Sequence, residues 1–194
     1  MIGIMADSHD NLTAISKAVD FFNENKVDMV IHAGDLISPF TVNEFKNLEM
    51  PFEAVYGNND GEREGLKKAY SNLCTLEDFK EIIIEEKKIG VIHGHQDKIT
   101  NALSCSGIYD VLITGHTHQS QISSINSDKS KFSDDTYGCS KESNELNNHQ
   151  NEIFNGLIKK TLVINPGETC GYLTGKNTVV LLNPVDLKCT MIEL

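Results

Sequence analysis

Side chains that can bind metal ions are concentrated in a few short motifs of this chain. Five of its seven histidines fall in three of these motifs. In chain order the motifs are Asp7-Ser8-His9, Gly34-Asp35, Gly57-Asn58-Asn59-Asp60, His93-Gly94-His95 and Gly115-His116-Thr117-His118. Carboxylate and imidazole groups together suit Mn, Fe, Ni, Co or Zn better than Mg or Ca, which prefer shells of oxygen alone. The motifs therefore predict a transition-metal site.

Each motif is weak evidence when it is taken alone. Asp7, Asp35 and Asn58 could be helix caps or turn residues, and a single histidine after a strand is more often structural than a ligand. Their joint placement favours ligation, because each motif lies where a predicted strand ends. In open α/β sheets the carboxyl ends of the strands form the crevice that binds ligands. In an extended D-x-H or H-x-H segment, the outer two side chains can also serve different metal ions.

Apolar runs and helical patterns alternate along the first two thirds of the chain. Predicted strands cover 2–5, 29–31, 52–56, 82–84, 89–92 and 109–113, and predicted helices cover 12–22, 39–48 and 98–103. Asp10 or Asn11 is placed to cap the first helix. Strands at 161–164, 178–182 and 188–192 follow as an antiparallel end. This order predicts an α/β core of βαβ units with added hairpins.

At these motifs the chain resembles the calcineurin-like metallophosphoesterase superfamily. The superfamily pattern of D-x-H, G-D, G-N-x-D/E, H and G-H-x-H is present in full and in order. Asn165-Pro166-Gly167 extends the resemblance to its small single-domain YfcE-type phosphodiesterases. The resemblance implies an α/β (α+β) fold, a four-layer αββα sandwich of two mixed β-sheets flanked by helices. It also implies a hydrolase of phosphoric ester bonds that acts on a small phosphate ester. A phosphodiesterase is expected in preference to a monoesterase.

The resemblance assigns ligands for two divalent metal ions, and no other cofactor is expected. Mn²⁺ is the first choice of metal, with Ni²⁺, Co²⁺, Fe²⁺, Zn²⁺ and Mg²⁺ as alternatives. One ion would be held by Asp7, His9, Asp35 and His118, and the second by Asp35, Asn58, His93 and His116. Asp35 would bridge the two ions, and a hydroxide bridging them would attack phosphorus. The residues expected to take part in catalysis are Asp35, Asn58 and His95.

Asn59 departs from the pattern of many superfamily members, which carry a histidine there that is thought to assist the leaving group. YfcE-type relatives often carry cysteine. An amide cannot protonate a leaving alkoxide near neutral pH, so the general acid stays unassigned. His32 is expected to lie buried beside the site. For Asn165 two roles stay open, one at the site and one in a turn with Pro166 and Gly167.

The whole chain, 1–194, is expected to form one metallophosphoesterase domain with a mobile surface insertion at about 123–155. That segment is rich in Ser, Asn, Asp, Glu and Lys and lacks a periodic apolar pattern. Such a composition cannot bury enough apolar surface to offset the entropy of ordering the chain. The sequence leaves two roles open for this segment, a passive loop or a lid over the site.

The composition limits the partners. A formal net charge of −11 argues against a stable nucleic-acid complex, which needs a basic surface. No apolar run approaches the ~20 residues of a membrane span, and the N-terminus does not read as a signal peptide, which predicts the cytoplasm and no membrane. Five scattered cysteines without a C-x-x-C pair favour reduced thiols. The sequence leaves a homo-oligomer open.

Two alternatives to the phosphodiesterase come from other classes of protein. The retromer scaffold subunit resembles this fold but has lost part of the metal shell, whereas all seven ligand positions are filled here. A nuclease is the other alternative. The negative charge and the lack of a basic stripe argue against long duplex substrates, while a short nucleotide stays open.

Overall fold

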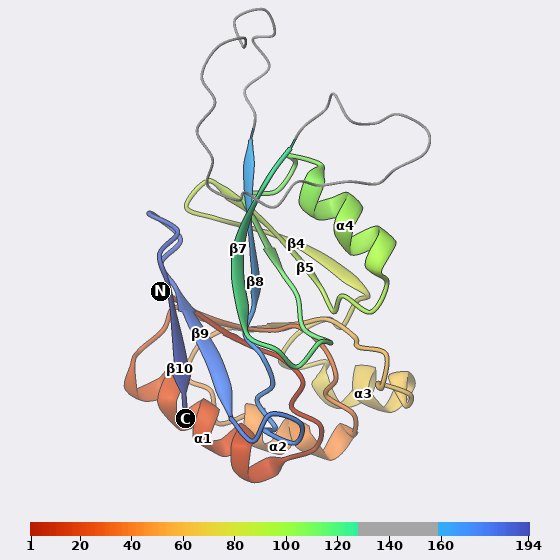
Figure 1. Cartoon of the computed structure of the whole chain (residues 1–194). Coiled ribbons are helices and arrows are strands. Elements are labelled where there is room, and N and C mark those ends of the chain that lie inside the picture. The colour runs from red at the N-terminus through yellow and green to blue at the C-terminus, as the bar shows by residue number, and fades with distance from the viewer. Residues whose placement is uncertain (128–158) are drawn as a thin grey trace, which may run out of the picture.

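The structure is a computed structural model that describes residues 1–127 and 159–194, in which two β-sheets pack between layers of helices (Figure 1). The first sheet has the strand order β10-β9-β1-β2-β3, and the second has the order β4-β5-β6-β8-β7. In chain order the strands are β1 (Ile2–Met5), β2 (Met29–His32), β3 (Phe52–Ala54), β4 (Phe79–Ile84), β5 (Lys87–Ile92), β6 (Val111–Ile113), β7 (Gln121–Asn126), β8 (Lys160–Asn165), β9 (Thr178–Leu182) and β10 (Cys189–Glu193). The helices are α1 (Leu12–Glu24), the 3-10 helix η1 (Pro39–Thr41), α2 (Val42–Phe45), α3 (Arg63–Tyr70) and α4 (Asp97–Cys105).

Two hydrophobic clusters hold these layers together. In the first, Phe22 of α1, Phe45 of α2 and Leu66 of α3 pack with residues of the first sheet. In the second, side chains of the two sheets meet, as Ile4 of β1 and Val91 of β5 do. Helix α4 packs against β7 and β8 of the second sheet. The arrangement confirms the predicted four-layer αββα sandwich of two mixed sheets.

The sheet interior explains why the first strand was easy to recognise. All four residues of β1 are buried, because helices cover one face of the sheet and the second sheet covers the other. Strands that are covered on both faces read as continuous apolar runs. The helix that follows begins as predicted, because the Asn11 side chain accepts a hydrogen bond from the Ala14 N–H at 3.2 Å.

The predicted insertion at 123–155 is wrong at its start. Residues Ser123–Asn126 belong to β7, which pairs antiparallel with β8 from Gln121↔Asn165 to Asn126↔Lys160. β7 is an edge strand and most of its side chains are exposed or half-buried, so it needs no apolar pattern. The remainder of the predicted insertion, from residue 128 to residue 155, lies outside the described residues.

The prediction that every cysteine is a reduced thiol is also wrong. Cys74, Cys170 and Cys189 are free, but Cys105 is disulfide-bonded. Spacing along a chain does not show which thiols the fold brings together.

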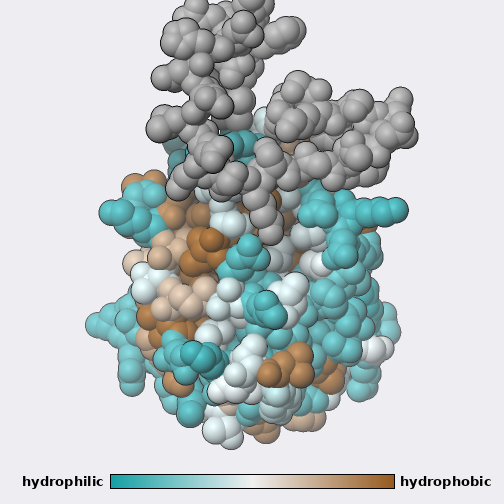
Figure 2. Space-filling model, in the orientation of Figure 1, coloured by the Kyte–Doolittle hydropathy of each residue, from teal (hydrophilic) through white to brown (hydrophobic). Residues whose placement is uncertain are grey.

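The hydrophobic interior reaches the surface along one side of the sandwich. On the face shown in Figure 2, hydrophobic residues (brown) gather on the left, in the region of β7, β9 and β10. Ile122 of β7 is exposed, and Leu181 and Met191 of the two C-terminal strands are only partly buried. Among the helices of the described residues, none is long and apolar enough to cross a membrane.

Candidate metal centre

Six parallel strands direct their carboxyl ends to one region of the molecule. β1, β2 and β3 run parallel in the first sheet, and β5, β6 and β8 run parallel in the second. The loops after these strands are hydrogen-bonded to one another. Asp7 N donates to Gly34 O at 3.0 Å, and Gly115 N donates to His93 O at 2.9 Å. The rule that ligand sites form at strand ends therefore holds for both sheets.

Asp35 lies at the centre of the cluster. Its Oδ2 is 3.3 Å from His9 Nε2 and 3.4 Å from His93 Nε2, so one carboxylate oxygen lies between two imidazole nitrogens. Its Oδ1 accepts a hydrogen bond from the Asn59 N–H at 2.9 Å, and the Asn59 side-chain amide donates to Oδ2 at 2.7 Å. The carboxylate is almost fully buried, with 1% of its surface exposed. An oxygen placed in this way can be shared by two cations.

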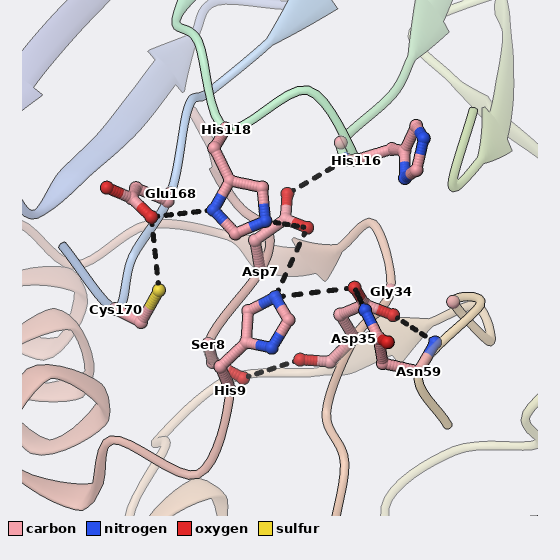
Figure 3. A network of polar contacts seen from close by, with 12 residues as sticks. Asp7, Ser8, His9, Gly34, Asp35, Asn59, His116, His118, Glu168 and Cys170 are labelled. Atoms are coloured by element: carbon pink, nitrogen blue, oxygen red, sulfur yellow. Dashed lines mark hydrogen bonds and ion pairs between the residues drawn. The ribbon is translucent and has the colours of Figure 1, made fainter. Parts of the chain in front are cut away.

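Asp7 forms the other carboxylate of the site, and Figure 3 shows His9 and His118 directed toward it. Asp7 Oδ1 is 3.8 Å from His9 Nε2 and 3.6 Å from His118 Nε2. Asp7 Oδ2 accepts a hydrogen bond from the backbone N–H of His116 at 3.0 Å. One oxygen of Asp7 is thus bound to the loop that carries two histidines, while the other faces two ring nitrogens.

The ring of His93 has a defined orientation. Its Nδ1 lies 2.8 Å from the Ala33 carbonyl oxygen, which can only accept, so Nδ1 carries the proton. Nε2 faces two oxygen acceptors, Asn58 Oδ1 at 3.0 Å and the Asp35 carboxylate. Positive charge at Nε2, as a proton or as a bound cation in its place, satisfies all three atoms.

His116 and His95 extend the cluster beyond His93. The ring centroid of His93 lies 5.3 Å from that of His116 and 5.7 Å from that of His95. Burial and the neighbouring rings of His93 and His116 lower the pKa of His95. A neutral His95 ring therefore lies beside the predicted ligands, consistent with a role next to the metal ions.

Five of the seven predicted ligands have backbones in the left-handed region, which side chains other than glycine seldom adopt. Their φ angles are 51° for Asp7, 42° for His9, 63° for Asp35, 70° for His116 and 60° for His118. Sparsely populated conformations of this kind cluster at functional sites, where the surrounding structure holds them in place. Asp and His tolerate this region better than most residues, so the sequence alone gave no sign of it.

Neighbouring polar side chains hold the ligand loops in place. Both oxygens of Asp60 accept backbone N–H groups, Oδ2 from Gly57 and Asp35 and Oδ1 from Ile37. Buried His32 lies 2.9 Å from the Ser8 hydroxyl, between Asp7 and His9 in sequence. Burial lowers the pKa of His32 to about 3, so this ring is neutral and structural.

Asn165 takes both of the roles that the sequence left open. Its amide nitrogen donates to the Gly115 carbonyl at 2.7 Å and to the Thr117 hydroxyl at 3.0 Å, which supports the loop of His116 and His118. Its oxygen accepts the Gly167 N–H at 2.9 Å, which closes the turn after β8.

Glu168 is a residue of the site that the sequence reasoning missed. It is fully buried, and its Oε2 lies 2.6 Å from His118 Nδ1. Burial would raise the pKa of Glu168, but hydrogen bonds from His118 and Thr174 lower it to about 2. Glu168 follows the parallel strand β8, so the strand-end rule that found the other motifs also applied to it.

The donor set fits divalent metal ions. Asp7 Oδ1 and His9 Nε2 are buried, yet neither has a hydrogen-bond partner in the described part of the chain, since their contacts with one another and with Asp35 are too long or poorly directed. Orphaned buried polar atoms of this kind often mark an ion. The carboxylate of Asp7 raises the pKa of His9. Burial would lower the pKa of His93, but Asp35 raises it, so the carboxylates favour positive charge at both positions.

Gly57 is required for the close approach of Asp35, and we expect Gly57→Ala to disturb the site. A Cβ at this position would lie 2.0 Å from Asp35 Oδ1 and 2.4 Å from Asp35 N. Crowding of a packed site typically costs ~1–3 kcal/mol. The variant should show a lower melting temperature and bind less metal by elemental analysis.

Gly61 provides the matched control in the same loop, because a Cβ there would meet nothing within 4 Å. Gly61→Ala should keep the melting temperature and metal content of the wild type. Wild-type metal content in Gly57→Ala would show that Asp35 does not need its observed position.

Comparisons with known proteins agree with this site. Residues 1–186 match the calcineurin-like phosphoesterase superfamily domain. The chain is 38% identical over 185 residues to phosphodiesterase MJ0936 of Methanocaldococcus jannaschii, covering 94% of this chain and 92% of the relative. A solved structure described as a novel archaeal phosphodiesterase is 37% identical, with a TM-score of 0.77 and coverage of 100% and 99%. YfcE, a phosphoesterase from E. coli, has a TM-score of 0.58 at 14% identity, with coverage of 98% and 97%, and shares the fold.

Proposed function

We propose that this chain, which belongs to the calcineurin-like phosphoesterase superfamily, hydrolyses small phosphodiesters with the help of two divalent metal ions. Membership makes it a metal-dependent hydrolase of phosphoric ester bonds. The name of its archaeal relative supports the diester as the substrate class.

The position of Asp35 Oδ2 carries this proposal. This oxygen lies 3.3 Å from His9 Nε2 on one side and 3.4 Å from His93 Nε2 on the other. His9 lies in one group of candidate ligands with Asp7 and His118, and His93 lies in another with Asp7 and Asp35. That geometry supports the proposal of two cations joined by one bridging residue.

The side chains divide between the two proposed ions. Asp7, His9 and His118 would complete one site with Asp35, since their ligand atoms lie close together around Asp7 Oδ1. Asn58, His93 and His116 would complete the other with Asp35. Two bound ions would polarise the phosphate and lower the pKa of a water molecule for in-line attack.

Catalytic roles are proposed for three residues of this chain. Asp35 and Asn58 would act through the metal ions that they hold. The neutral ring of His95, beside His93 and His116, would donate a hydrogen bond to the phosphate. Mn²⁺ is the proposed metal, because imidazole and carboxylate ligands together suit it. The cytoplasm is the proposed location, inferred from the sequence.

A scaffold without activity is the second candidate function, and the ligand geometry argues against it. All seven predicted ligand positions carry side chains that can bind a metal ion, and Asp7, His9, Asp35, His93 and His118 lie in groups that could hold one, which a scaffold does not require. The formal charge of −11 likewise argues against a nuclease acting on long duplexes.

Removal of the metal ions tests the proposed function. After exhaustive chelation we expect hydrolysis of a bis-aryl phosphodiester to fall by about 10²-fold or more, because metal charge stabilises the transition state by several kcal/mol. Addition of Mn²⁺ should restore the rate. The matching aryl monoester should react more slowly than the diester. Full diesterase activity in protein shown to be metal-free by elemental analysis would refute the proposal.

A further inference from the structure

Glu168 is a buried carboxylate with hydrogen-bond donors on both oxygens. Oε1 accepts the N–H of Leu173 at 2.9 Å and the Thr174 hydroxyl at 2.7 Å, and it also accepts the Thr174 N–H. Oε2 shares the Leu173 N–H at 3.1 Å and lies 2.6 Å from His118 Nδ1 and 3.3 Å from the Cys170 thiol. Glu168 itself has 0% of its surface exposed. Its negative charge is therefore held in place by the loop that follows it.

This arrangement fixes the proton on the ring of His118. A carboxylate surrounded by donors acts as an acceptor, so His118 Nδ1 must carry the proton and donate it to Glu168. The Nε2 lone pair then faces Asp7 Oδ1, 3.6 Å away, on the side of the candidate metal site. Figure 3 shows the ring of His118 between Glu168 and Asp7.

His118 differs in this respect from His93. The ring of His93 is held by a neutral acceptor, the Ala33 carbonyl, at 2.8 Å, whereas that of His118 is held by a charged one. A carboxylate partner makes a ligating imidazole more basic than a carbonyl does. The ligand His118 is thus supported by a carboxylate, and the ligand His93 by a backbone carbonyl.

We propose that Glu168 is a positioning residue that orients His118 and strengthens metal binding in the site of Asp7, His9 and His118. This inference rests on the proposed two-metal function and adds a residue to it. Glu168 does not contact the site of Asn58 and His93, so its influence is confined to one ion. The loop of Leu173 and Thr174 holds the carboxylate in position.

Glu168→Gln tests the proposal because an amide has only one accepting oxygen. The three donors from Leu173 and Thr174 would bind that oxygen and direct the NH₂ group at His118. The Gln NH₂ group and the His118 Nδ1–H, both donors, would then face each other unless the His118 proton moved to Nε2. A proton on Nε2 would prevent that nitrogen from binding the metal ion. Loss of such a partner typically weakens metal binding about 10–100-fold. Titration calorimetry with Mn²⁺ should therefore show one weakened site and one unchanged site.

Two spectroscopic readouts separate positioning from a general structural role. Electron paramagnetic resonance of the Mn²⁺-loaded wild type should show the signal of a spin-coupled pair of ions. At limiting Mn²⁺, the Glu168→Gln variant should instead show the signal of a single ion. In metal-free protein, ¹⁵N NMR of the imidazole rings should place the His118 proton on Nδ1 in the wild type and on Nε2 in the variant.

Thr174→Val is the matched control. It removes one hydroxyl donor from Glu168 but leaves the contact with His118 in place. Both sites should keep wild-type affinity in this variant. Melting temperatures of the metal-free proteins report whether each variant is folded.

Several outcomes would overturn the proposal. They are wild-type affinity at both sites in Glu168→Gln, an equal loss at both sites, and an unchanged His118 tautomer. The NMR readout decides the matter even if the variant binds no metal. A wild type that binds two ions but cleaves no phosphodiester would refute the proposed function and leave the role of Glu168 intact.

Discussion

Asp35→Asn is expected to weaken both metal sites, whereas Asp7→Asn is expected to weaken one. Asp35 Oδ2 lies beside a candidate ligand of each ion, His9 on one side and His93 on the other. Asp7 Oδ1 faces His9 and His118, which are proposed ligands of the same ion. Removal of one partner from a buried pair of charges costs about 3–5 kcal/mol, or roughly 10²–10⁴-fold in affinity. The loss of diesterase activity should be correspondingly larger for Asp35→Asn.

The measurements are metal content by elemental analysis and turnover of a phosphodiester. Asp20→Asn serves as the control, because it removes one negative charge from the exposed side of α1. It should bind two ions and keep its rate. Equal metal loss from Asp7→Asn and Asp35→Asn would contradict the bridging role of Asp35.

Asn59→His should accelerate the hydrolysis of esters with poor leaving groups. The Asn59 amide donates to Asp35 Oδ2 at 2.7 Å, so this side chain lies at the site, but an amide is too weak an acid to protonate a leaving alkoxide. The wild type should therefore react much faster with aryl esters than with alkyl esters. An imidazole in this place can act as a general acid, which is typically worth ~10²–10⁴-fold.

A series of esters with graded leaving-group pKa measures this effect in the wild type and in Asn59→His. Asn59→Gln is the control, because it also alters the contact with Asp35 but supplies no acid. Its dependence on the leaving group should stay as steep as that of the wild type. A flat dependence in the wild type would show that another acid, such as a bound water, already protonates the leaving group.

Features with a local signal could be predicted from the sequence. β1 is an unbroken apolar run because both of its faces are buried. Helix α1 has its amphipathic pattern and its cap at Asn11. The candidate ligands occur in short motifs after strands, so the sheet topology alone explains why the structure brings them together.

The elements that were missed have weak local signals. Helix α3 buries only Leu66 and Tyr70, one turn apart, and the rest of its face is polar. The edge strand β7 is largely exposed and reads as loop. Glu168 follows a predicted strand but belongs to none of the motifs, and its burial and its contact with His118 arise only when β8 is placed beside β6.

The left-handed backbone of the candidate ligands has a consequence for protein engineering. At His9, Asp35 and His118 the observed φ angles suit glycine better than the residues that are present. Stabilising substitutions often cost activity where a strained site is required for function. A redesign that chooses residues by their preference for the observed φ angles, without the metal ions, would therefore replace these residues first. Thermostable variants of this chain should be sought with these loops held constant and selected in the presence of Mn²⁺.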